Sequence, residues 1–281
     1  MRKSLTMIML FLMVAALLTG STANVQASGT TSDSYTYTVA DNQATITGYT
    51  GTQINLVIPT LIEGVSVTGI GIRAFYMRTE LLSVTIPFGV KTIRDSAFSG
   101  CKNLTSVSIP SSVNYIEESA FSDCSSLTSV NIPSGVTTIE YRTFAGCTSL
   151  TSVTIPSSVT WILNGAFAGC VNLKKIIIPS SVTYIGADSG LKNPPVTIHG
   201  STGSYAHTYA QENNIPFEVL GQIMRGDAND DKKIDIMDLV AIIDYIVSGI
   251  EPISKINADA NASGDIDIMD LVWIIDVIVG S

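Results

Sequence analysis

The chain has 281 residues, of which 46% are hydrophobic and 14% are charged, and its formal net charge is −9. This composition supplies enough apolar side chains for a sizeable core and excludes a largely disordered chain. Acids and bases balance in residues 1–225, so the whole negative charge falls in residues 226–281. A balance of this kind argues against binding to nucleic acid, which requires a basic surface, and favours a cation site.

The N-terminus has the features of a signal peptide. Arg2 and Lys3 precede an apolar run from Leu5 to Leu18, and small residues lead to Ala27, after which cleavage is predicted. The run is shorter than the roughly 20 residues that a membrane-spanning helix needs, and no later segment replaces it. Residues 1–27 are therefore predicted to be removed, and the mature protein is predicted to be extracellular and not membrane-spanning.

A β-hairpin is predicted next, as the cap of a longer structure. Residues 35–39 and 44–47 alternate polar and apolar side chains, and Asp41 and Asn42 lie in the connection between them. Asp and Asn are favoured in the tight turns that join two antiparallel strands.

The middle of the chain repeats with a period of 23 residues. Three columns keep this step, namely an Ile-Pro pair, a phenylalanine and a cysteine. The members are Ile86, Ile109, Ile132, Ile155 and Ile178; Phe98, Phe121, Phe144 and Phe167; and Cys101, Cys124, Cys147 and Cys170. Each unit has two short apolar segments of strand character, separated by a turn at the proline. Units this short bury their apolar faces only by stacking, which predicts a β-rich solenoid with capped ends.

These residues resemble the leucine-rich repeats of the BspA-like type. The resemblance covers about residues 35–219 and includes a C-terminal cap around residues 196–217. It implies a domain over residues 28–219, followed by a linker at 220–225. Proteins of this type are mostly surface or secreted binding proteins, so the expected ligand is a protein, a cell-surface component or a plant-wall glycan.

The four cysteines occupy one column of the repeat. Equal spacing stacks them about 5 Å apart with parallel Cβ vectors, which is poor disulfide geometry. We expect a column of buried thiols, with disulfides and a metal site as the alternatives.

The residue before the second-strand isoleucine forms a second notable column. Its aromatic members, Tyr115, Trp161 and Tyr184, are candidates for a ligand-binding stripe, because aromatic rings dominate binding energetics. The alternative is packing against neighbouring turns. No catalytic residue is predicted: no nucleophile motif accompanies His199 and His207. Glu117, Glu118 and Glu140 are expected to be solvated, with a paired-carboxylate glycosidase site as the alternative.

Two acidic loops follow at a step of 32 residues. Residues 227–229 recur as 259–261 with Asp-Ala-Asn in both, and residues 234–240 recur unchanged at 266–272. Oxygen ligands fall at positions 1, 3, 5, 9 and 12 of each loop, and a backbone carbonyl at position 7 completes the set that calcium prefers. The predicted ligands of two Ca²⁺ ions are Asp227, Asn229, Asp231, Lys233, Asp235 and Asp238, and Asp259, Asn261, Ser263, Asp265, Asp267 and Asp270. Each loop leads into an apolar stripe at helical spacing, so a small all-α, EF-hand-like module is expected over residues 226–281.

This segment resembles the type I dockerin of cellulosomes, in which each loop is followed by a helix but lacks the entering helix of an EF-hand. It departs from an ordinary EF-hand in carrying Asp238 and Asp270 at position 12 and Lys232 at position 6. The resemblance implies a cohesin module of a scaffoldin as the partner. The implied contact residues are Ile236, Met237, Val240, Ala241, Ile268, Met269, Val272 and Trp273. Because both copies carry the same Ile-Met pair, either helix is expected to make the main contact with the cohesin, which gives two binding orientations related by a pseudo-twofold axis.

The favoured function is therefore a secreted, non-catalytic binding protein docked through its dockerin to a scaffoldin, in a cellulosome or at the cell surface. Its association with polysaccharide catabolism would follow from that assembly. Two alternatives stay open: a cellulosomal enzyme or accessory factor in polysaccharide degradation, and a free surface adhesin.

Overall fold

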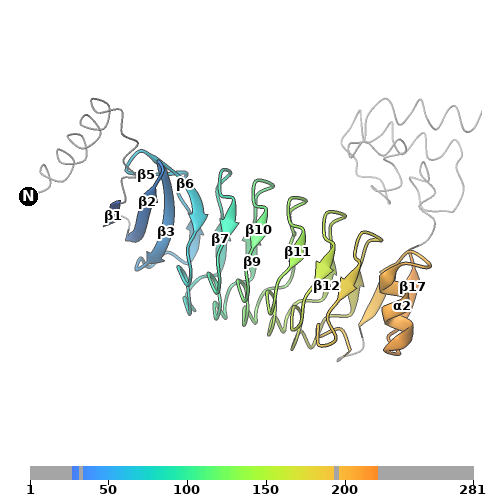
Figure 1. The fold of residues 1–281 in the computed structure, drawn as a ribbon. Helices are drawn as coiled ribbons and strands as arrows, with labels where there is room; N and C mark the ends of the chain where they lie inside the picture. Colours follow the sequence, from blue (N-terminus) through green and yellow to red (C-terminus); the bar gives the residue numbers. More distant parts are fainter. Residues whose placement is uncertain (1–26, 32–33, 193–195, 221–281) are drawn as a thin grey trace, which may run out of the picture. The chain divides into compact units, whose positions relative to one another are not determined.

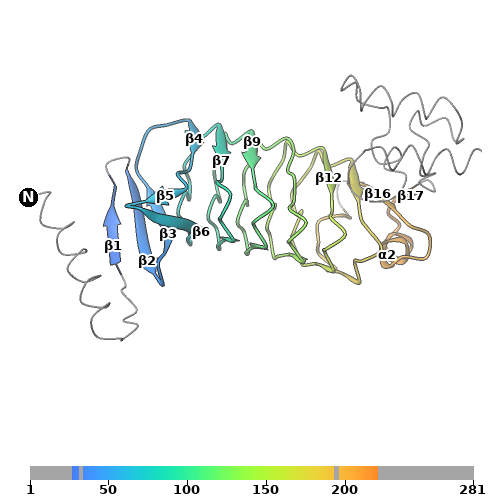
Figure 2. The same ribbon diagram turned by 90° about the horizontal axis from the view of Figure 1, so that it is seen from above.

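The computed structural model of the chain describes residues 27–31, 34–192 and 196–220. These residues form a stack of short strands between two caps, which runs from left to right along the chain in Figures 1 and 2. Residues 1–26 of the predicted signal peptide, residues 221–225 of the predicted linker and the acidic module lie outside the described residues. No helix in the described ranges is long and apolar enough to span a membrane.

The N-terminal cap is the predicted hairpin with additional strands. β1 (Ala27–Thr30), β2 (Tyr35–Ala40) and β3 (Gln43–Tyr49) pair antiparallel in this order. Asp41 and Asn42 both have positive φ, at 50° and 57°, the backbone geometry of a two-residue hairpin turn with matching twist. β3 then pairs in parallel with β6 (Val65–Ile70), whose other neighbours include the antiparallel β5 (Leu61–Ile62). The cap thus passes directly into the solenoid.

All repeats but the one that begins near residue 127 contribute two short strands, as the sequence predicts. The first strands are β4 (Asn55–Val57), β7 (Ser83–Thr85), β9 (Ser106–Ser108), β12 (Ser152–Thr154) and β14 (Lys175–Ile177). The second strands are β8 (Thr92–Ile93), β10 (Tyr115–Ile116), β11 (Thr138–Ile139), β13 (Trp161–Ile162) and β15 (Tyr184–Ile185). The proline carbonyl closes the turn between them: the amide of Val113, for example, donates to the carbonyl of Pro110 over 3.1 Å.

The core consists of the predicted apolar columns in register. The rings of Phe75, Phe98, Phe121, Phe144 and Phe167 are fully buried, and consecutive rings stack with centroids 4.9 to 5.8 Å apart. The aromatic row continues into the N-terminal cap, where Tyr49 lies 5.9 Å from Phe75 and 4.8 Å from Tyr35. Stacking at strand spacing therefore buries a ring that no single repeat could cover alone.

The cysteine column is a row of buried free thiols, as expected. Each thiol donates a hydrogen bond to the phenylalanine carbonyl of the preceding repeat, for example from Cys124 to Phe98 over 3.2 Å. Burial raises the pKa of the Cys101 and Cys170 thiols to about 12, and it also raises the pKa of Cys124 and Cys147. The thiols thus stay protonated and serve as donors.

Both sheets are interrupted between the same two repeats. β4, β7 and β9 form one sheet and β12, β14, β16 and β17 another, while β8 and β10 are separated from β11, β13 and β15. Residues 127–132, for which the repeat predicts a strand, form none.

Two substitutions in the repeat coincide with this interruption. Ser112, Ser158 and Ser181 each donate a hydroxyl hydrogen bond to a valine carbonyl of the preceding repeat, over 2.6 to 2.9 Å. Gly135 occupies the same place in the interrupted repeat and has no hydroxyl. In addition, Thr143 takes the alanine place before the core phenylalanine, where it is buried and bonds to the carbonyl of Glu140 over 2.9 Å. The hydroxyl hydrogen bond is therefore missing at Gly135, and the bulkier side chain of Thr143 replaces alanine, in the repeat where the two sheets are interrupted.

The C-terminal cap contains a helix that the sequence analysis did not predict. β16 (Thr197–Gly200) is followed by α2 (Tyr205–Glu212) and β17 (Phe217–Val219). Ser204 caps the helix by accepting from the His207 amide over 3.2 Å, and Tyr209 reaches back to the Ser189 hydroxyl over 3.1 Å. The cap therefore closes the core beyond the last repeat.

Candidate functional site

The predicted aromatic stripe lies on the outer side of the second strands. Successive side chains of a strand point to opposite faces, so burial of the isoleucine at each second position turns the residue before it outward. Tyr115, Trp161 and Tyr184 are 63%, 53% and 42% exposed. They do not pack into the core, so the structure brings them to an accessible surface.

The strand register sets the order of this column. Trp161 pairs with Thr138 on one side and with Tyr184 on the other, in parallel strands. Tyr115 pairs with Thr92 and lies across the interruption from Thr138. The Trp161 and Tyr184 side chains thus stand on neighbouring strands, roughly 4.8 Å apart at the backbone.

A row of small polar side chains flanks the aromatic column on one side. Asn114, Thr137, Thr160 and Thr183 each precede a column residue, and all four are exposed. The Thr160 hydroxyl donates to the Thr137 carbonyl over 3.3 Å, and the Thr183 hydroxyl donates to the Thr160 carbonyl over 3.4 Å. Because their hydrogens are engaged, these two hydroxyls offer oxygen lone pairs to an incoming ligand.

Carboxylates flank the column on the other side. Glu117 and Glu140 follow β10 and β11 and are partly buried, whereas Glu118 is exposed. Burial, followed by the charge of Glu118, raises the pKa of the Glu140 carboxyl. An oxygen of Glu117 accepts from the Asp95 amide over 3.0 Å. Glu117 and Glu140 are therefore less solvated than the sequence analysis expected.

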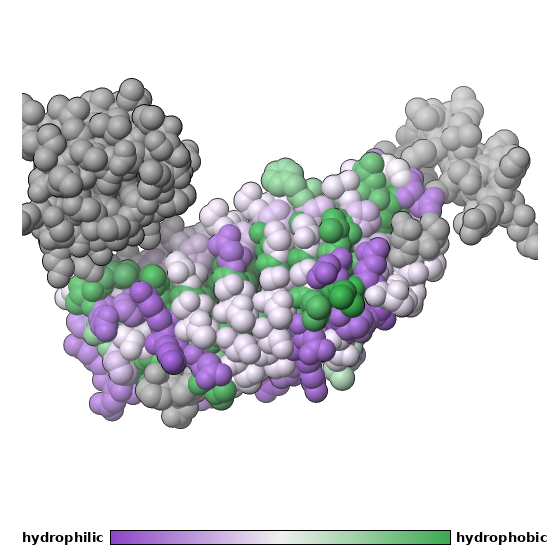
Figure 3. Space-filling view, turned by 180° about the vertical axis from the view of Figure 1, so that it is seen from behind, coloured by the Kyte–Doolittle hydropathy of each residue, from purple (hydrophilic) through white to green (hydrophobic). Residues whose placement is uncertain are grey.

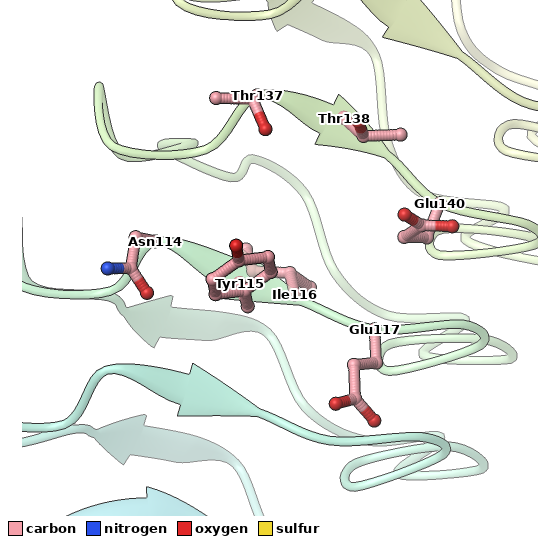
Figure 4. A pocket seen from close by; sticks show the side chains of 7 residues that line it. All are labelled: Asn114, Tyr115, Ile116, Glu117, Thr137, Thr138 and Glu140. Carbon is pink, nitrogen blue, oxygen red and sulfur yellow. The ribbon is translucent and has the colours of Figure 1, made fainter.

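A small hollow lies where the two sheets are interrupted. It encloses about 50 Å³ and is lined by Asn114, Tyr115, Ile116, Glu117, Thr137, Thr138 and Glu140. Figure 4 shows the two glutamates beyond the ends of β10 and β11. Along β10, Tyr115 lies between Asn114 and the end of the strand that carries Glu117. The hollow thus joins the aromatic column to both flanks.

A wider hollow lies on the turns that follow these strands. It measures about 480 Å³, and its lining residues are Glu118, Tyr141, Arg142, Asn164, Gly165, Ala168 and Asp188. Tyr141 was not predicted as a site residue, although it shares the 23-residue step with Glu118 and Asn164. Charges of both signs line this hollow, so it has no marked preference for an anion or a cation.

The two histidines belong to the C-terminal cap. His199 lies 3.4 Å from the Glu218 carboxylate, and burial, together with the charge of Lys175, lowers the pKa of its imidazole. His207 accepts from the Gly203 amide over 3.0 Å, and its ring lies 4.6 Å from that of Phe217. Both side chains thus have structural partners.

The predicted calcium and cohesin residues lie outside the described ranges. The calcium set is Asp227, Asn229, Asp231, Lys233, Asp235, Asp238, Asp259, Asn261, Ser263, Asp265, Asp267 and Asp270, and the cohesin set is Ile236, Met237, Val240, Ala241, Ile268, Met269, Val272 and Trp273. Within the described ranges, no group of three or more His, Cys, Asp or Glu side chains is placed to hold a metal ion.

Two protein families match separate parts of the chain. Residues 68–190 match the BspA type leucine rich repeat region, in 6 copies. Residues 225–278 match the dockerin type I domain. No curated protein matches the chain.

Solved structures of leucine-rich repeat proteins are similar to the described domain. The leucine-rich repeat protein of T. pallidum is 25% identical, with a TM-score of 0.51, over 70% of this chain and 97% of that one. A leucine-rich repeat protein from Bacteroides capillosus is 31% identical over 39% of this chain and 84% of that one, with a TM-score of 0.36. The pneumococcal vaccine antigen PcpA is 24% identical over 59% of this chain and 48% of that one, with a TM-score of 0.49. The first of these supports the solenoid fold.

Proposed function

Because the chain joins BspA-type leucine-rich repeats to a C-terminal type I dockerin domain, we propose that it is a secreted, non-catalytic protein that docks onto a cohesin module of a scaffoldin. The dockerin match over residues 225–278 carries this proposal, since a dockerin implies a cohesin partner. The signal-peptide features of residues 1–27 agree with an extracellular assembly. The proposed domain boundaries are those of the sequence analysis, with repeats over 28–219 and the dockerin over 226–281.

Calcium would hold the docking module together. Type I dockerin domains bind calcium, and the duplicated loops supply only oxygen donors, which suit this hard cation. We assign one ion to the loop that starts at Asp227 and one to the loop that starts at Asp259. A module this small gains much of its folding free energy from bound metal, so calcium would support folding and docking together.

Cohesin contact would come from the Ile-Met pairs and the helix faces that follow them. Ile236 and Met237 recur as Ile268 and Met269, one pair in each loop. Exposed aliphatic and thioether side chains of this size are costly in water without a partner. Their duplication would give the module two equivalent surfaces.

The repeat domain would carry the ligand that the assembly recruits. Its likeness to leucine-rich repeat solenoids indicates a non-enzymatic repeat protein. The exposed aromatic column on the second strands supplies a contact surface without a deep cleft. The domain thus fits a binding role better than a catalytic one.

The test is a calorimetric titration of the full chain against a panel of cohesins, in calcium and in chelator. We expect calcium-dependent binding that is lost when Asp227→Ala and Asp259→Ala are combined. Asp188→Ala, at an exposed acid of the repeat domain, is the matched control and should bind normally. Calcium uptake without binding to any cohesin would contradict docking and favour the free surface adhesin.

A further inference from the structure

We propose that Tyr115, Trp161 and Tyr184 bind a neutral polysaccharide whose chain runs along the solenoid axis. This inference deepens the proposed function and rests on it, because it names the ligand class of the repeat domain.

The rings are arranged for a long ligand that crosses the strands. Trp161 and Tyr184 are direct neighbours in register, and Tyr115 lies two repeats before Trp161. At one strand spacing per repeat, the backbones of Tyr115 and Trp161 are about 10 Å apart. A ligand that lies across β10, β11, β13 and β15 would therefore meet all three rings in line.

The exposed rings suit the apolar face of a sugar. The face of an aromatic ring carries partial negative charge and attracts weakly positive groups. The C–H groups on one face of a pyranose ring are such groups, and both surfaces are flat. Trp161 and Tyr115 are more than half exposed, which leaves room for a ring to stack on them.

The flanks of the column offer hydrogen-bond acceptors. Thr160 and Thr183 have their hydroxyl hydrogens engaged with backbone carbonyls, so their free lone pairs can accept. The carboxylates of Glu117 and Glu140 accept on the opposite side. Sugar hydroxyls can donate to both rows, and the hollow of about 50 Å³ beside Tyr115 has room for a hydroxyl group or a bridging water.

The charges near the column oppose anionic polymers. Glu117, Glu118 and Glu140 lie at its centre and would repel uronate or sulfate groups. Lys91 and Arg94 flank Thr92, which is the neighbour of Tyr115 on the side away from Trp161 and Tyr184. An uncharged chain rich in hydroxyls fits this distribution best.

A protein partner fits this surface less well. The most exposed aliphatic and phenylalanine side chains, Phe88, Val57 and Ile72, lie on the turn after β7, on β4 and after β6, outside the column. Figure 3 shows the hydrophobic residues of one face as separate patches within a largely weakly polar surface. Protein interfaces instead concentrate apolar and aromatic residues in one buried centre.

The experiment uses the full chain in calcium, run by native electrophoresis through gels that contain hydroxyethylcellulose, xyloglucan or polygalacturonate. We expect retardation by at least one neutral polymer and none by polygalacturonate. Combining Trp161→Ala with Tyr184→Ala should weaken the affinity about 10-fold or more, because exposed aromatic anchors dominate such contacts. Phe88→Ala removes a ring that is more exposed than either of these and lies outside the column, and it should leave the retardation unchanged.

A gain-of-binding variant protects the test against misfolding. Thr138→Trp places a ring between Tyr115 and Trp161, and should strengthen retardation by a neutral polymer several-fold. Absence of retardation by both neutral polymers, or retardation that survives loss of both rings, would overturn the inference. Titration of the same proteins with a cohesin separates the two proposals. A chain that binds cohesin but no neutral polysaccharide refutes this inference alone. An unmodified chain that binds no cohesin refutes the proposed function.

Discussion

The thiol of Cys124 donates a hydrogen bond over 3.2 Å to the carbonyl oxygen of Phe98, in the preceding repeat. The same bond recurs at the other cysteines of the column, at 3.1 to 3.3 Å. Each thiol is therefore a second donor to a phenylalanine carbonyl that also accepts from a backbone amide of its own turn. The column acts as a hydrogen-bonded seam between repeats as well as a packing element.

Removing one donor from this seam should destabilise the solenoid. Cys124→Ala removes one of the two donors to the Phe98 carbonyl, which keeps the Cys101 amide, and opens a small cavity, so the free energy of unfolding should fall by about 1 to 2 kcal/mol. Cys124→Ser keeps a donor at the same place and should lose less. Urea denaturation of the two variants measures the difference, and equal losses would show that the hydrogen bond contributes little.

The buried thiols should be unreactive and should make stability fall at alkaline pH. Burial raises the pKa of Cys101 and Cys170 to about 12 from an ordinary value of 9.0. Because the folded state binds these protons more tightly than the unfolded state, the free energy of unfolding is unaffected by the thiols below about pH 9. It falls as the pH rises from there towards 12, since the unfolded chain then loses the protons first. At pH 8, a thiol reagent should label the native protein very slowly and the urea-unfolded protein at all four cysteines. Rapid labelling of the native protein would contradict this burial.

The interruption between β10 and β11 should respond to Gly135. Gly135→Ser restores the hydroxyl that Ser112, Ser158 and Ser181 use to bind a valine carbonyl. An added Cβ would lie 3.1 Å from the Val113 carbonyl, a tight contact that the serines at the equivalent positions accommodate. We expect a gain of about 0.5 to 1.5 kcal/mol and slower amide hydrogen exchange over residues 137–140. Ser158→Gly is the reverse change and should cost a similar amount; faster exchange in Gly135→Ser would refute the assignment.

The two Ile-Met pairs of the dockerin should be interchangeable. Replacing Ile236 and Met237 with alanine should leave cohesin binding nearly intact, because the pair at Ile268 and Met269 can lead instead. Replacing both pairs should abolish binding. Calorimetric titration of the unmodified chain, the variant without the first pair and the variant without both pairs measures their affinities for the cohesin. Loss of cohesin binding when only the first pair is replaced would rule out two binding orientations.

The periodicity of the sequence predicted the core because a solenoid places equivalent residues in one column. The phenylalanines, the cysteines and the isoleucine before each proline could be assigned to the core without a structure, since a step of 23 residues places the members of each column in the same environment. The hairpin cap was likewise predicted from Asp41 and Asn42. These features depend on local turns and on stacking in register, and the spacing of the repeated residues determines both.

Features that break the period could not be predicted in the same way. The helix α2 is one short segment after the last repeat, and its only strong local signal is the capping Ser204. The interruption of the sheets coincides with Gly135 and Thr143, each a single departure from its column, whose effect depends on contacts between repeats. The hollow at the candidate site lies at that interruption, so it was not predicted either.

The most direct test of the account asks whether one chain holds a cohesin and a polysaccharide at the same time. A labelled cohesin is mixed with an insoluble form of the neutral polysaccharide that retards the chain in gels, with or without the full chain, and the label that sediments is measured in calcium. The account predicts that the cohesin sediments only when the full chain is present, and that either a chelator or the combined Trp161→Ala and Tyr184→Ala variant prevents it. Sedimentation that persists in chelator, or no sedimentation although the chain binds cohesin in solution and a neutral polysaccharide in gels, would contradict the two-module account.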